Sequence, residues 1–141
     1  MRRVSREYVF KLVFEYTFYD GVNDDTLELF LTDADLTDED REYIRECYYG
    51  VISGMDRLKA KLGSRLERFT VDRLYRPDMV VLLIALYELE RGDTPAKVVV
   101  NEAVDLAKKY GTEKSGGFVN GVLAKFVRRD PAPDESAKRD V

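Results

Sequence analysis

Apolar residues recur at helical spacing along almost the whole chain, and this spacing limits the fold more than any other feature of the sequence. Near the start, Val9, Leu12, Val13 and Tyr16 fall at positions i, i+3, i+4 and i+7, which share one face of an α-helix. No segment sustains the alternation of apolar and polar residues that marks a half-buried strand. A chain of 141 residues can bury one core. The sequence therefore predicts a single all-α domain.

Capping residues, prolines and glycines predict where the helices begin and end. Ser5 is expected to cap the first helix, which ends at Asp20–Gly21. Thr37 is typical of an N-cap, because three acidic residues follow it and negative charge is favoured in a first helical turn. Further helices are expected over residues 25–31, 38–62, 79–89, 95–110 and 118–128, and a short helix with a loop over 64–76, anchored by Leu66, Phe69 and Leu74.

The end of the chain differs in composition from the rest. Residues 131–141 contain two of the four prolines and are mostly polar. We therefore expect a folded domain over residues 1–130 and a flexible C-terminal tail over residues 131–141.

Charge is distributed unevenly along the chain, although the net charge is only −4. Residues 20–46 carry eleven acidic residues against two arginines, whereas residues 1–12, 57–76 and 97–129 are each net basic. An overall acidic chain does not bind nucleic acid indiscriminately, but its local basic faces can still hold phosphate.

Several classes of chemistry are excluded by residue types that are missing or rare. The chain has no histidine, which excludes Ser-His-Asp and Cys-His catalysis and histidine-ligated zinc. The lone Cys47 lies in an apolar helical stripe, where it is interpreted as a core residue, and it fits a reducing compartment. No apolar run is long enough to span a bilayer, and no signal peptide is recognisable. We expect a cytoplasmic protein with no membrane association, no metal, no cofactor and no enzymatic activity.

Two features of the residues themselves favour contact with RNA or protein. The first is an arginine cluster on an N-terminal arm and first helical turn, where long side chains can reach phosphates or stack on unpaired bases. The second is the loop over residues 112–117, whose glycines expose backbone amides before a helix N-terminus that favours anions.

The C-terminal half carries motifs of a known family. Residues 98–111 (VVVNEAVDLAKKYG), Ser115 and residues 118–123 (FVNGVL) closely resemble the C-terminal signature of the bacterial transcription antitermination factor NusB family. Residues 85–89 (ALYEL) and Pro95 match the preceding helix and turn, and residues 2–7 (RRVSRE) resemble the arginine-rich N-terminus. The resemblance covers most of residues 2–128.

This resemblance implies a fold and a function. It implies a compact bundle of about seven helices in two three-helix subdomains. It also implies a factor that binds boxA RNA together with the ribosomal protein NusE and joins RNA polymerase complexes that resist termination, notably on ribosomal RNA operons. An alternative is a NusB-like adaptor or accessory domain for an RNA-modifying enzyme, with RNA contact supplied by its partner.

The resemblance also implies site residues. Asp78 matches an acidic position near the partner surface. From the residues alone, Phe118 is favoured as a core aromatic at a helix start; in the family, that position lies on the RNA side. The implied RNA-binding residues are Arg2, Arg3, Arg6, Lys114, Ser115 and Phe118.

Overall fold

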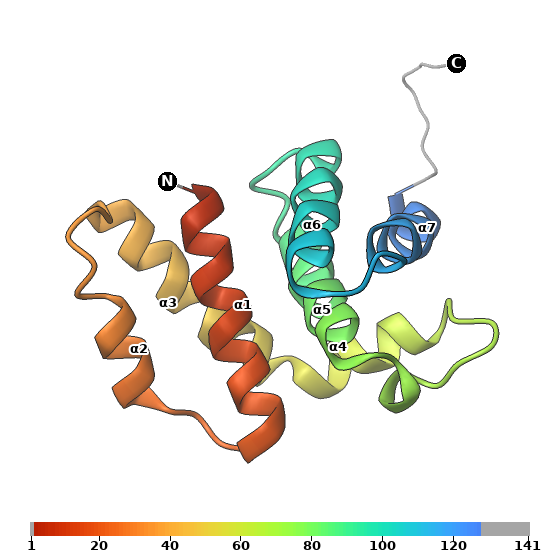
Figure 1. Ribbon diagram of the computed structural model, residues 1–141, viewed down its shortest axis with the longest axis horizontal. Coiled ribbons are helices and arrows are strands. Elements are labelled where there is room, and N and C mark those ends of the chain that lie inside the picture. The colour runs from red at the N-terminus through yellow and green to blue at the C-terminus, as the bar shows by residue number, and fades with distance from the viewer. Residues whose placement is uncertain (1, 128–141) are drawn as a thin grey trace.

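The computed structural model describes residues 2–127, which form seven α-helices and one short 3-10 helix, with no strand (Figure 1). The expected tail over residues 131–141 lies outside the described residues. Within them, no helix is long and apolar enough to cross a membrane. The elements are α1 (Arg2–Tyr19), α2 (Asp24–Phe30), α3 (Asp38–Ser53), α4 (Met55–Gly63), η1 (Val71–Arg73), α5 (Arg76–Arg91), α6 (Ala96–Tyr110) and α7 (Ser115–Val127).

The apolar helix α5 is the centre of the bundle. It packs against α1, α3, α4, α6 and α7. Figure 1 shows α1, α2 and α3 grouped at one end of the molecule and α6 and α7 at the other. Residues Met79 to Leu86 of α5 are all buried, as expected for a helix that is covered on both sides. The all-α fold with two helical halves is confirmed.

Several helix boundaries follow the capping signals. Thr37 caps α3 through a reciprocal capping box, in which its hydroxyl accepts from the Asp40 N–H and the Asp40 carboxylate accepts from the Thr37 N–H. The chain leaves α1 at Asp20, which has a left-handed backbone with φ of 57°. Gly92 ends α5 with φ of 74°, a conformation that glycine adopts without strain.

Three boundary predictions are wrong. Helix α1 already begins at Arg2, so there is no N-terminal arm ahead of it within the described residues, and Ser5 is a buried interior residue instead of a cap. The predicted helix over 38–62 is divided at Gly54, whose backbone ends α3 and begins α4. Helix α7 begins at Ser115 instead of Phe118, because the Ser115 side chain closes the preceding turn.

A buried ion pair joins the two halves. Arg6 of α1 donates from Nε to Glu88 Oε2 at 2.9 Å and from Nη2 to Glu88 Oε1 at 3.0 Å. Tyr43 of α3 donates its hydroxyl to the same Oε2 at 2.9 Å. The Arg6 and Glu88 side chains are only 5% and 7% exposed. Burial alone would lower the pKa of Arg6, but its hydrogen bonds to Glu88 hold that pKa above its ordinary value.

Breaking this ion pair from one side should destabilise the fold. Replacing Arg6 with alanine leaves the Glu88 carboxylate buried without its cation, and this change should lower the free energy of unfolding by about 3–5 kcal/mol. The double variant Arg6→Met with Glu88→Gln should lose clearly less, because no uncompensated charge stays buried. Urea unfolding followed by circular dichroism measures both. Equal losses in the single and double variants would contradict the prediction.

Candidate nucleic-acid interface

The three N-terminal arginines face different surroundings. Arg2 lies over the Tyr43 ring, with its guanidinium carbon 4.0 Å from the ring centroid. Arg3 is 62% exposed and donates to Glu102 at 3.1 Å and to Asp105 at 2.9 Å, both on α6. Arg6 is buried in its pair with Glu88. Of the three, only Arg3 presents an exposed guanidinium, and two carboxylates already neutralise it.

The loop between α6 and α7 is closed by its own hydrogen bonds. The Thr112 N–H donates to Ser115 Oγ at 2.9 Å, and the Lys114 N–H donates to Thr112 Oγ1 at 3.2 Å. Gly111 makes this turn possible, because a Cβ there would overlap the Ser115 side chain. Ser115 is therefore buried and structural, whereas the Lys114 side chain stays exposed with no ion pair among the described residues.

A cavity of about 390 Å³ opens beside this loop. Phe118, on the first turn of α7, meets Phe69 from the segment between α4 and α5 at a centroid distance of 6.4 Å and an interplanar angle of 88°. Phe69 and Tyr75 are each 52% exposed, which is unusual for large aromatic side chains. The cavity is lined by Phe69, Arg73, Leu74, Tyr75, Asp78, Thr112, Lys114, Ser115 and Phe118.

Asp78 contributes an unsatisfied acceptor to the cavity. It lies in the first turn of α5 and is only 7% exposed. Its Oδ1 is buried without a hydrogen-bond partner among the described residues. Burial raises the pKa of Asp78, and a hydrogen bond with the Ser115 hydroxyl partly offsets this effect.

The structure thus divides the expected site into two clusters. Asp78, Lys114, Ser115 and Phe118 share one cavity. The arginines lie near Glu88, ten residues beyond Asp78 on α5, which is about 15 Å along a helix. The clusters therefore sit at opposite ends of α5.

The segment between α4 and α5 adds residues that the sequence did not assign to a site. Phe69 was expected to anchor the core, but it is exposed at the cavity. Arg73 and Tyr75 line the same space, and Arg73 has no ion pair among the described residues. The sequence does contain a pattern that could have indicated this site, because Phe69 lies between Arg68 and Arg73. Aromatic residues interleaved with arginines are typical of surfaces that bind single-stranded nucleic acid.

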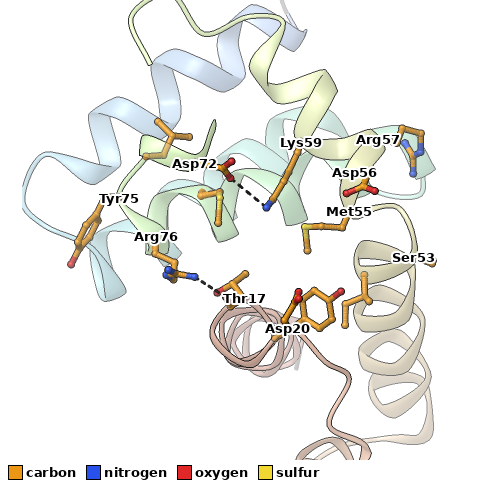
Figure 2. Close-up of a pocket in the computed structure, with 14 residues that line it drawn as sticks. Thr17, Asp20, Ser53, Met55, Asp56, Arg57, Lys59, Asp72, Tyr75 and Arg76 are labelled. Carbon is orange, nitrogen blue, oxygen red and sulfur yellow. Dashed lines mark hydrogen bonds and ion pairs between the residues drawn. The ribbon is translucent and has the colours of Figure 1, made fainter. Parts of the chain in front are cut away.

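A second cavity, between α1, α3, α4 and α5, has a different character. It encloses about 950 Å³ between the end of α1, the α3–α4 junction and the start of α5. Figure 2 shows two of its cations engaged, Lys59 with Asp72 and Arg76 with the Thr17 carbonyl. The Lys59–Asp72 distance is 3.6 Å, and Arg76 donates to the carbonyl at 2.9 Å. Acidic and basic side chains are balanced here, so nothing favours a polyanion. No group of residues within the described range could hold a metal ion.

A third surface is apolar and open. A groove of about 480 Å³ runs along α1 toward the start of α5, where Pro77 borders it. Phe10 is buried at its base, Phe14 is half-buried, and Phe18 and Tyr19 are 57% and 78% exposed. Such an exposed aromatic strip is typical of a protein-contact surface.

Comparison with known proteins identifies relatives along nearly the full chain. The sequence model of the NusB family matches residues 3–128. Transcription antitermination protein NusB of Ruminiclostridium cellulolyticum is 40% identical over 141 residues, which cover 99% of this chain and 97% of that protein. Its namesake in Agathobacter rectalis is 41% identical over 129 residues, covering 89% and 98%.

Solved structures agree with this assignment. The T. maritima NusB structure superposes with a TM-score of 0.84 at 34% identity, covering 92% of each chain. A chain in the crystal structure of antitermination factors NusB and NusE in complex with dsRNA has the same fold, with a TM-score of 0.78 at 22% identity over 88% of this chain and 93% of that chain. The family match over residues 3–128, together with relatives near 40% identity, shows that the chain belongs to the NusB family.

Proposed function

We propose that this chain is a non-enzymatic, cytoplasmic transcription antitermination factor that binds boxA-type single-stranded RNA together with NusE. It joins RNA polymerase complexes that resist termination, notably on ribosomal RNA operons. The names of its relatives support this role. The observation that carries the RNA-binding part is the cavity at the α6–α7 loop, where exposed aromatic rings lie beside cations that have no acidic partner among the described residues.

The proposed RNA contacts fall into three kinds. Phe118 provides a ring on which a splayed base can stack, and Lys114 provides a phosphate contact at the rim. Arg2 and Arg3, at the other end of α5, would reach a phosphate by exchanging their present contacts, which are the Tyr43 ring for Arg2 and Glu102 and Asp105 for Arg3. Arg6 and Ser115 are buried, so they act by positioning α1 and the loop.

The partner surface is proposed along the aromatic groove of α1. This groove ends at Pro77, the residue before Asp78, which the sequence resemblance places near the partner surface and whose side chain lines the neighbouring cavity. Helices α2 and α3, which carry most of the acidic segment, pack against the same α1. A basic partner is therefore favoured electrostatically on this side of the molecule.

A second candidate is an adaptor that depends on its partner for RNA contact. The arginine cluster favours it, because Arg6 is buried and the charge of Arg3 is countered by Glu102 and Asp105. Few counterions would then be released when this chain binds RNA alone.

Salt dependence separates the two candidates. If Lys114 contacts a phosphate, Lys114→Ala should reduce the log–log salt slope of single-stranded RNA binding by about 0.7. Phe118→Ala should weaken binding by about 1–3 kcal/mol through lost stacking. Arg45→Ala, an exposed arginine on α3 in the acidic half, is the control and should change neither value. A slope indistinguishable from zero in the unmodified protein would favour the adaptor.

Coupling between the ligands tests the shared assembly. NusE should raise RNA affinity about ten-fold or more, roughly 1.4 kcal/mol, because it extends the positive surface, and RNA must raise NusE affinity equally. Phe18→Ala in the groove should weaken NusE binding and leave binding of RNA alone unchanged. Calorimetric titrations with and without the other ligand measure both effects. RNA affinity that does not respond to NusE would rule out the coupling.

A further inference from the structure

We propose that the cavity at the α6–α7 loop is a pocket for one unpaired base, in which Phe69 forms a second aromatic wall and Asp78 selects a base that carries an amino group. This inference rests on the proposed RNA binding and adds to it residues from the segment between α4 and α5. Neither Phe69 nor Arg73 belongs to the RNA site implied by the sequence resemblance.

The two phenylalanine rings form a corner instead of a closed core contact. They meet almost perpendicularly at 6.4 Å, and Phe69 stays 52% exposed. A base that stacks on one ring therefore presents its edge to the other, and both geometries are favourable for aromatic groups. Covering the exposed ring also removes apolar surface from water. A cavity of about 390 Å³ is large enough for one base.

The charges of the cavity orient the ligand. Lys114 and Arg73 line it, and both are exposed and lack ion pairs among the described residues. They can hold the phosphates on either side of the inserted base. Asp78 is the buried acid of the cavity, and a carboxylate there repels a phosphate. The arrangement thus admits a base to the interior and leaves the backbone outside.

The Asp78 carboxylate can discriminate between nucleobases by hydrogen bonding. Its Oδ1 is buried without a hydrogen-bond partner among the described residues, which is an uncommon and unfavourable state. The N4 amino group of cytosine donates to aspartate, whereas uracil presents a carbonyl oxygen at the same ring position. A cytosine therefore satisfies the free acceptor, and a uracil in the same pose would place two acceptors together.

The test uses the full chain and two probes, oligocytidylate and oligouridylate of about eight nucleotides. Fluorescence anisotropy at neutral pH and fixed salt gives the affinities. Cytidylate should bind the unmodified protein about five-fold more tightly. Phe69→Ala should weaken both probes about ten-fold, and Phe69→Tyr should restore them. Tyr49→Ala, a 42% exposed aromatic on α3, is the matched control and should have no effect.

Asp78→Asn tests the selection step. The amide of asparagine can donate as well as accept, so the preference for cytidylate should fall to less than two-fold while uridylate binding is kept or improved. The variant should stay folded, because burial already disfavours the charged carboxylate, and circular dichroism checks this. A cytidylate preference that survives Asp78→Asn would overturn the selective role of Asp78.

The remaining outcomes separate this inference from the proposed function. If Phe118→Ala weakens RNA binding and Phe69→Ala does not, RNA binding stands and the second wall is wrong. If Phe69→Ala weakens only NusE binding, the cavity takes a protein side chain and the inference is wrong. If the unmodified protein binds neither probe, with or without NusE, both the proposed RNA binding and this inference fail.

Discussion

The buried ion pair between Arg6 and Glu88 is the interaction on which the rest of the structure depends. It joins α1 to α5, and the Tyr43 hydroxyl brings α3 to the same carboxylate. Two charges in a protein interior are tolerated only when they satisfy each other with good geometry, so α1, α3 and α5 must be placed to bring these three side chains together. The positions of the groove on α1 and of the cavity at the start of α5 therefore depend on this ion pair.

This ion pair also changes how the N-terminal arginines are understood. On a helix, residues four apart share a face and adjacent residues do not. Arg2 and Arg6 accordingly turn toward Tyr43, while Arg3 points to the acids of α6. A run of arginines that resembles an RNA-binding segment in the sequence is therefore largely engaged within the protein. Lys114 and Arg73, two cations without an acidic partner in the part of the chain that the structure describes, lie at the other end of α5.

The sequence predicted what depends on local interactions. Periodicity located the helices, and Thr37 marked the start of α3 because its capping box involves only residues three apart. It did not predict the division at Gly54 or the exposure of Phe69. Gly54 lies at a junction of two helices that both pack on α5, but α3 also packs on α1 and α4 on η1. The place of Phe69 is set by Phe118, forty-nine positions away, and no local pattern records such a contact. For the same reason the sequence resemblance assigned Asp78 to the partner surface but did not place it in the cavity with Phe69 and Phe118.

The start of α5 lies between the groove proposed for the protein partner and the cavity proposed for an RNA base, so it can couple the binding of the two ligands. Pro77 borders the aromatic groove of α1, and the next residue, Asp78, lines the cavity of Phe69 and Phe118. Both belong to the first turn of α5, directly before the buried run from Met79 to Leu86. A partner that packs on the groove would fix the turn, and a base in the cavity would fix it from the opposite side. Each ligand then lowers the ordering cost of the other, and linkage requires the two effects to be equal.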